Sequence, residues 1–431
     1  MDAGKQLWMS ECTNIYISAN FVNIKIDIHR ALERPQIAHG PMATTCRIGA
    51  HDLAVGPGKE VQLMRPATEL LGQKGLQQRL KDDGYLYLQQ VLPRDLVAAA
   101  RKAVLAALES SGMVLKGENG KLNPEANCAT DQGAVPASLA RSPEMLALVE
   151  SHELKQLMQE ILGSESVQTL DHKWLRAVGH GENSGFHTDS VYLNKGSREG
   201  LTCWIPLGDV DLRLGGLCVV GRSHCDPSFD KVRQTYSAID VETAGIRGTG
   251  WFTEDPHEIL SYGCPLLTAP FAMTDMVVFR LDTMHGSLSN GSQPGEVRIS
   301  CDTRWYDAND PHGVDARYMG ENPMGTATWW VNRHNKEVFP TSMEEAKIAW
   351  GLTSWLVGYP RWFPVCKYVD IDAEKRQNMP SSMIPYACPR VVGPQARMRL
   401  AVTLNWGKRE APRDADGMDY IKIIKVMALS Q

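Results

Sequence analysis

The stretch "GFHTDSVYLN", residues 185–194, places a histidine and an aspartate two positions apart in an apolar run that reads as a β-strand. On a strand, residues i and i+2 point to the same face. His187 and Asp189 are therefore expected side by side, with Thr188 facing the other way. An imidazole beside a carboxylate is a candidate metal site, and the rest of the chain has to decide whether the couple is more than chance.

The same His-x-Asp spacing occurs a second time, at His224 and Asp226. This pair follows the strand-like run "GGLCVV" and stands directly before Pro227, which restricts the backbone of the residue that precedes it. We therefore interpret the second pair as part of a turn, in which His224 makes structural hydrogen bonds. The first pair remains the stronger candidate for metal ligation.

A third ligand is expected from a later strand, and His285 follows the apolar run "MVVFRL" at 276–281. Together with His187 and Asp189 it would form a set of two histidines and one carboxylate. Such a set occupies one face of an octahedral ion and leaves the opposite face open, as in non-haem Fe(II) oxygenases.

Arg298 opens another predicted strand, "VRISCDTRWY", after a turn-rich segment at 286–296. We expect a hairpin that returns this strand beside His285. A planar guanidinium is suited to binding a carboxylate through two hydrogen bonds. A small dicarboxylate co-substrate could then chelate the metal with one end and meet Arg298 with the other.

Strand alternation places Ser300, Asp302 and Arg304 on the same face as Arg298. If Arg298 points inward, the other three do as well. We interpret Asp302 and Arg304 first as an internal ion pair, and contact with the substrate is the alternative.

The rest of the chain predicts a mainly β fold with flanking helices. Between about 75 and 163 the patterns predict a helix that stops at Gly84, the strand "YLYLQQV" and two further helices, the second over 142–163. Short strands between turns follow from about 165. This order favours a jelly roll, that is, a cupin-like barrel. We expect an N-terminal extension at 1–70, a core domain at 71–320 and a Trp-rich C-terminal extension at 321–431 that packs on or caps the core.

Composition restricts the function further. The chain has 431 residues with 45 Lys and Arg against 50 Asp and Glu, so it has no basic excess of the kind that nucleic-acid binding requires. Its ten cysteines form no C-x-x-C pair and are expected to be reduced. No apolar run reaches the length of a membrane span and no signal peptide is visible. We expect a cytoplasmic protein with a small-molecule substrate, in which neither nucleic acid nor membrane is a partner; the oligomeric state stays open.

Four segments, in this order, resemble the phytanoyl-CoA dioxygenase family: "LKDDGYLYLQQVLP", "KWLRAVGHGENSGFHTDSVYL", "TCWIPLGDVDLRLGGLCVVGRSH" and "HGSLSNGSQPGEVRISCDTRW". The resemblance covers roughly residues 70–320. It implies a double-stranded β-helix and a dioxygenase that uses Fe(II), 2-oxoglutarate and O₂ and releases succinate and CO₂.

The resemblance also implies roles for individual residues. His187, Asp189 and His285 would hold iron, and Arg298 would bind the distal carboxylate of 2-oxoglutarate. Ser287 falls where the family often has a hydroxyl contact to the co-substrate, and Trp204 resembles an aromatic residue of the pocket wall. The carboxylate of Asp189 fills the place that a halide would need, which favours hydroxylation over halogenation.

Two residues near the metal strand, Lys173 and His180, are further candidates for the pocket, although each is first interpreted as structural. Two rival functions remain: a cupin-like, non-redox metalloenzyme and a non-catalytic β-helix binding protein. Arg298 argues against the first, because such an enzyme does not need to bind a remote carboxylate. The complete set of ligands argues against the second.

Overall fold

The computed structural model describes residues 44–114, 135, 137–324 and 328–352, and the strand pair 369–370 and 399–400. Contacts divide the chain into two units, residues 1–352 and 353–431. In the second unit, β13 (Val369–Asp370) pairs antiparallel with β14 (Arg399–Leu400). The strand-like run near the N-terminus, at 14–28, lies outside the described residues. The domain boundaries at residues 70 and 320 stay predictions.

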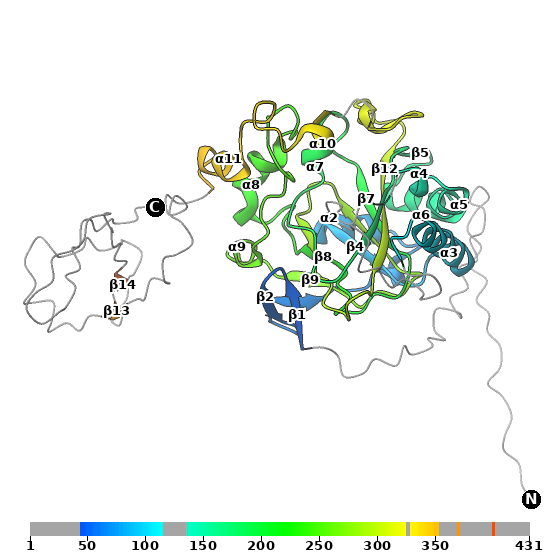
Figure 1. Cartoon of the computed structure of the whole chain (residues 1–431), viewed down its shortest axis with the longest axis horizontal. Coiled ribbons are helices and arrows are strands. Elements are labelled where there is room, and N and C mark those ends of the chain that lie inside the picture. Colours follow the sequence, from blue (N-terminus) through cyan, green and yellow to red (C-terminus); the bar gives the residue numbers. More distant parts are fainter. Residues whose placement is uncertain are drawn as a thin grey trace, which may run out of the picture. The chain divides into compact units, whose positions relative to one another are not determined.

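Two sheets form the frame of the first unit (Figure 1). The larger has the strand order β4-β10-β7-β12-β5, with β6 also paired to β12, and the smaller has the order β11-β8-β9-β3. The larger sheet consists of β4 (Tyr85–Leu88), β5 (Val167–Thr169), β6 (Trp174–Val178), β7 (Leu201–Pro206), β10 (Met276–Arg280) and β12 (Arg298–Asp307). The smaller consists of β3 (Val61–Leu63), β8 (Leu217–Val220), β9 (Leu266–Thr268) and β11 (His285–Ser287). A separate hairpin joins β1 (Thr45–Ile48) to β2 (His51–Ala54).

Side chains alternate along each strand, so the larger sheet contributes to a separate apolar cluster on each face. On the inner face, Tyr87, Trp204 and Val277 pack with Leu217 and Val219 of β8, so this cluster lies between the two sheets. On the outer face, a second cluster joins the sheet to the helices α2 (Leu76–Asp83), α3 (Arg94–Ser110), α5 (Pro143–Val149) and α6 (His152–Leu162). The predicted double-stranded β-helix with flanking helices is confirmed, and the two sheets stay separate in the hydrogen-bond pattern of the described strands.

The run 142–163, whose pattern suggests one helix, forms two. Ser151 interrupts the run because its hydroxyl accepts a hydrogen bond from the backbone N–H of Leu154 and so begins α6. Gly163, in the left-handed conformation, ends that helix. The break lets α5 pack against α3 while α6 packs against β5 and β12, and both helices bury apolar residues in the same cluster.

Further short elements complete the first unit. They are α4 (Ala137–Ala140), α7 (Ser190–Leu193), α8 (Asp230–Gln234), α9 (Pro256–Leu260), α10 (Thr328–Asn332) and α11 (Met343–Ala349), with 3₁₀ turns at Thr68–Leu70, Pro227–Phe229, Tyr236–Ala238 and Ala316–Tyr318. α11 begins with a Ser342 cap, which forms a capping box with Glu345. Trp329 and Phe339 are buried in a cluster with Tyr236.

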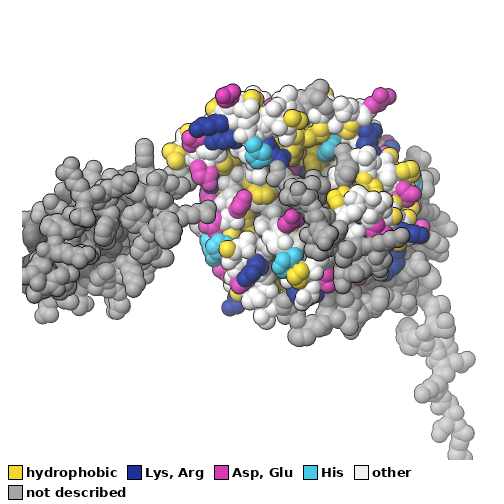
Figure 2. Space-filling view, viewed as in Figure 1, with side chains coloured by type: hydrophobic (Ala, Val, Ile, Leu, Met, Phe, Trp, Pro, Cys, Tyr) yellow, Lys and Arg dark blue, Asp and Glu magenta, His cyan; other side chains and the backbone are white. Residues whose placement is uncertain are grey.

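Two observations concern the surface of the described residues. None of their helices is long and apolar enough to cross a membrane. Acidic and basic side chains are interspersed over the described part of the face in Figure 2.

Candidate metal centre and co-substrate site

The two sequence-distant histidines meet through the backbone. The N–H of His187 donates to the carbonyl of His285 at 2.8 Å, and the reverse bond is 2.9 Å. The prediction of a strand over the whole of "FHTDSVYL" is wrong, because this pairing is a single bridge and α7 begins at Ser190. The pairing ends there because the residues that would continue it, 281–284, form a turn before β11.

His187, Asp189 and His285 are all buried, and one ligand atom from each lies within 4.8 Å of the others. The Nε2 atom of each histidine is 3.9 Å from Oδ1 of Asp189. Each Nδ1 faces a carbonyl, that of Gly185 at 2.8 Å and that of Thr283 at 3.0 Å. Since a carbonyl only accepts, Nδ1 carries the proton and Nε2 keeps its lone pair for a metal. The donor set therefore fits a divalent ion.

Burial favours neutral imidazoles at this cluster. Desolvation, with the neighbouring His285, lowers the pKa of His187 to about 3. Desolvation also lowers the pKa of His285. Burial opposes ionisation of Asp189, but the charge of Arg304, the two histidines and the Thr202 hydroxyl outweigh it and hold the pKa of the carboxyl below its usual range. At neutral pH the cluster offers two free imidazole nitrogens and one carboxylate.

Two strands of the larger sheet hold the carboxylate of Asp189. Thr202 on β7 donates to Oδ2 at 2.5 Å, and Nη2 of Arg304 on β12 donates to Oδ1 at 2.9 Å. Thr202 was not singled out from the sequence. It could have been found only from the register of β7 against β12, in which Thr202 and Arg304 are direct cross-strand partners on the inner face.

Arg298 is buried, and its Nη1 donates to the carbonyl of Gly215. Its Nε atom has no hydrogen-bond partner among the described residues, and neither has the hydroxyl of Ser300, which is also buried. Desolvation, with the charge of Arg176, lowers the pKa of Arg298 to about 10, so the guanidinium remains charged at neutral pH. A buried cation beside an unsatisfied hydroxyl fits the carboxylate of a co-substrate.

The expected hairpin between His285 and Arg298 is wrong. β11, which begins at His285, belongs to the smaller sheet, whereas β12 lies in the larger one. The strand that precedes His285, β10, is separated from β12 by β7. The turn-rich segment therefore crosses from one sheet to the other, because one edge of β12 pairs with β7 and the other edge pairs with β5 and β6.

The other predicted cofactor residues lie as follows. The Ser287 hydroxyl, two residues after His285 on β11, accepts a hydrogen bond from the N–H of Ser184 at 2.9 Å. Trp204 is buried between the sheets, with its ring centroid 4.8 Å from that of Phe271.

The inward face of β12 is as predicted, since Ile299, Cys301 and Trp305 pack on the opposite, helix-covered side. Its ion pairs differ from the expectation: Asp302 pairs with Arg176 at 3.0 Å, and Arg304 pairs with Asp189. The sequence pattern gave no way to find Arg176, because its register opposite Ser300 appears only in the folded sheet.

Lys173 and His180 are directed elsewhere. Lys173 is buried and pairs with Glu150 at 2.9 Å, and Nδ1 of His180 lies 2.7 Å from the carbonyl of Ser292. In the second His-x-Asp pair, Nε2 of His224 lies 2.8 Å from the carbonyl of Lys81, and Asp226 caps the turn that follows. The structural interpretation of that pair is confirmed.

A small cavity opens beside the triad. His187 and Asp189 line it together with Trp174, Arg176, Tyr192, Leu193, Trp251, Arg304 and Trp330. Most of these wall residues were missed, because they come from β6, α7, α10 and a loop, which are far apart in the sequence. The position of the cavity beside the candidate metal ligands makes it the candidate substrate pocket.

Comparisons with known proteins agree with this site. The phytanoyl-CoA dioxygenase family model matches residues 80–298. A 1-deoxypentalenic acid 11-beta-hydroxylase from Streptomyces exfoliatus is 26% identical over 268 residues, which cover 58% of this chain and 87% of the relative. The non-haem alpha-ketoglutarate-dependent carbocyclase SnoK from nogalamycin biosynthesis is 21% identical, with 57% of this chain and 88% of that chain covered and a TM-score of 0.40. EctD from S. alaskensis with bound Fe is 16% identical, with 61% and 84% covered and a TM-score of 0.40.

The family model spans half of the chain, and its matched range contains His187, Asp189, His285 and Arg298. The buried triad is of the kind that binds non-haem iron. The chain belongs to the phytanoyl-CoA dioxygenase family and is an iron- and 2-oxoglutarate-dependent oxygenase.

Proposed function

We propose that this oxygenase hydroxylates, or otherwise oxidises, a small organic substrate in the cavity beside His187. Iron is held by His187, Asp189 and His285, and Arg298 binds the remote carboxylate of 2-oxoglutarate. The observation that carries the proposal is the convergence of the three ligand atoms within 4.8 Å of one another in a buried site.

Each side chain has a separate task in this proposal. The two Nε2 atoms and Oδ1 of Asp189 bind the metal, while Thr202 and Arg304 fix the orientation of the carboxylate. When bound, iron and 2-oxoglutarate supply the oxidising chemistry, in which O₂ gives one oxygen atom to the substrate and one to succinate, with loss of CO₂. The protein orients the reactants and excludes water, which is its usual contribution in cofactor enzymes.

Arg298 and Ser300 set the position of the co-substrate. Both side chains are buried on the inner face of β12, and both have polar atoms without partners among the described residues. A carboxylate placed there would satisfy Nε of Arg298 and the Ser300 hydroxyl together. Leaving such donors buried and unpaired costs about 1–3 kcal/mol each, which a bound carboxylate would recover.

Hydroxylation is the outcome we favour among possible oxidations. The curated relative is named as a hydroxylase. The aspartate in the triad also keeps three protein ligands on the metal, so that the open face serves the co-substrate and O₂.

The test is the release of succinate from 2-oxoglutarate by the purified chain with Fe(II) in air, measured with and without candidate substrates. H187A and D189A are expected to abolish release. H224Q is the matched control, because it changes the histidine of the second His-x-Asp pair, whose Nε2 faces the carbonyl of Lys81. Persistent release by both triad variants, or its loss only in H224Q, would contradict the proposal.

A further inference from the structure

We propose that the substrate carries an anionic group, most simply a carboxylate, and that Arg304 binds it with Arg176 nearby. A flat apolar body would extend from this group along the aromatic wall of the cavity. The inference rests on the proposed function, since it concerns the substrate of that same site.

Arg304 is a buried cation with unused donors. Its side chain is 4% exposed, its Nη2 donates to Oδ1 of Asp189, and its guanidinium carbon lies 4.1 Å from the ring centroid of Trp174. Its Nε and Nη1 atoms have no hydrogen-bond partner among the described residues. Buried polar groups in proteins are normally satisfied, and Arg304 lines the cavity, so a ligand that enters the cavity can supply the missing acceptor.

In the loaded site Arg304 shares the charge of its ion-pair partner Asp189 with the iron, so the sum of charges leaves one positive charge in excess. Iron carries two positive charges, which Asp189 and one carboxylate of 2-oxoglutarate balance. The second carboxylate balances Arg298, and Asp302 balances Arg176 through their ion pair at 3.0 Å. The half-exposed Glu182 accepts a hydrogen bond from the N–H of Gly179 and is not part of the cavity lining. One positive charge remains, and a monoanionic substrate neutralises it.

Arg176 reinforces the positive character of this side of the cavity. It stands opposite Ser300 on neighbouring strands, and Trp174, two residues earlier, stands opposite Asp302. Trp174 and Arg176 therefore share the inner face of β6, and both line the cavity. An anion beside Arg304 would lie in the field of two guanidinium groups in a site shielded from water, where charge–charge attraction is strongest.

The remaining wall of the cavity is aromatic. The rings of Tyr192 and Trp330 are nearly parallel, at 23° and 6.0 Å between centroids, and Trp251 lines the same space. These rings offer flat apolar surface to a ring system or a rigid hydrocarbon.

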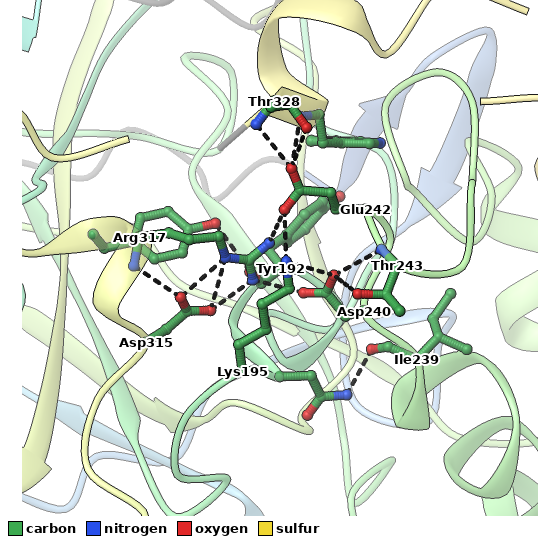
Figure 3. A network of polar contacts seen from close by, with 12 residues as sticks. Tyr192, Lys195, Ile239, Asp240, Glu242, Thr243, Asp315, Arg317 and Thr328 are labelled. Atoms are coloured by element: carbon green, nitrogen blue, oxygen red, sulfur yellow. Dashed lines mark hydrogen bonds and ion pairs between the residues drawn. The ribbon is translucent and has the colours of Figure 1, made fainter. Parts of the chain in front are cut away.

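The aromatic wall is held in place by a polar network, seen in Figure 3. Arg317 donates to the carbonyl of Tyr192 at 2.8 Å and to Glu242 at 2.7 Å, and Glu242 accepts from the N–H of Thr328, the first residue of α10. Because α10 carries Trp330, the network also restrains the backbone that bears this ring. The network therefore restricts the movement of these rings before the substrate binds, which lowers the entropic cost of binding.

The experiment uses the full chain loaded anaerobically with Fe(II) and 2-oxoglutarate. Matched pairs of flat probes, such as 1-naphthoate with 1-naphthamide and indole-3-acetate with indole-3-acetamide, are titrated while tryptophan fluorescence and the visible charge-transfer band are recorded. In the wild type we expect each carboxylate to bind about tenfold or more tightly than its amide. R304Q should abolish this preference, and R304K, which keeps the charge near Asp189 but loses the planar fork, should reduce it. R213Q is the control for charge, because Arg213 pairs with Asp211 on the surface.

The outcomes separate this inference from the proposed function. If no charge-transfer band forms in the wild type, the proposed function fails and the inference fails with it. If the band forms but carboxylates bind no better than amides, or bind too weakly to detect, only the inference is overturned. It is also overturned if the preference survives in both Arg304 variants, or if R304Q raises the requirement for 2-oxoglutarate as strongly as R298Q does.

Discussion

Thr202 and Arg304 lie directly opposite each other on neighbouring antiparallel strands, and each donates a hydrogen bond to a different oxygen of Asp189. The aspartate itself comes from a turn outside the sheet. The rigid larger sheet therefore fixes the orientation of the one ligand that the local backbone does not hold. Supporting contacts of this kind commonly change metal affinity by about 10–100-fold.

The first prediction concerns this support. T202V removes the hydrogen bond to Oδ2 while nearly keeping the shape of the side chain, and we expect it to weaken Fe(II) binding by about tenfold. Anaerobic metal titration measures the effect. T268V is the matched control, because Thr268 is also a fully buried strand threonine but donates to the carbonyl of Leu217 in the smaller sheet. Equal iron affinities of the two variants would show that Thr202 does not support the metal site.

Arg298 and the co-substrate provide the second prediction. R298Q removes the buried charge, and we expect the 2-oxoglutarate concentration for half-maximal succinate release to rise by about 100-fold, since losing one partner of a buried charge pair costs about 2–5 kcal/mol. Fe(II) affinity should change little, because Arg298 contacts Gly215 and none of the metal ligands. The surface variant R213Q should behave as wild type. A normal requirement for 2-oxoglutarate in R298Q would place the carboxylate elsewhere.

The network of Figure 3 provides the third prediction. Burial opposes ionisation of Glu242, but hydrogen bonds from Lys195, Thr328 and Arg317 outweigh it and lower the pKa of the carboxyl to about 2. E242Q removes this charge and should loosen α10. We expect faster hydrogen exchange at 328–332 and a higher KM for the organic substrate, with Fe(II) affinity unchanged. Unaltered exchange at α10 in E242Q would contradict the role of this network.

The fourth prediction concerns the pH dependence of stability. Desolvation, with the charges of Arg304 and Arg176, lowers the pKa of His172 from 6.5 to about 3. Between these values the unfolded chain binds a proton that the folded chain does not, so acidification lowers the free energy of unfolding, by up to about 1.4 kcal/mol per pH unit for this group. This loss of stability from His172 is absent above pH 6.5 and has reached its full size below pH 3.

H172F tests this linkage because a phenyl ring can keep the edge-to-face packing against Trp174, whose ring centroid is 4.4 Å away. Urea unfolding of both metal-free proteins at pH 5 and pH 7.5 gives the comparison. The variant should lose less stability than the wild type on acidification, whatever its stability at pH 7.5. Equal losses in the two proteins would show that His172 does not remain neutral in the folded state.

Local sequence patterns predicted much of the fold. The alternation in "VRISCDTRWY" identified the inward face of β12, and Gly84 marked the end of α2, where it adopts a left-handed conformation. Spacing and residue type also identified the three candidate iron ligands. The reason is that each of these features depends on residues within a few positions of one another, or on a residue type with few alternative uses.

Features that depend on the pairing of distant strands could not be predicted. The partners Thr202 and Arg176 follow from the register of β7 and β6 against β12, which only the folded sheet defines. The strand expected around His187 is a single bridge because its partner turns away at 281–284. The aromatic cavity wall likewise combines Trp174, Trp251 and Trp330, which no local pattern relates.

The most direct test of the central claim is anaerobic titration of the full chain with Fe(II) in the presence of 2-oxoglutarate, followed by the visible charge-transfer band. We predict one iron per chain, with the band lost in H187A and in H285A but kept in H224Q. A band that survives in both triad variants, or fails to form in the wild type, would contradict the claim that these two histidines and Asp189 bind one ferrous ion.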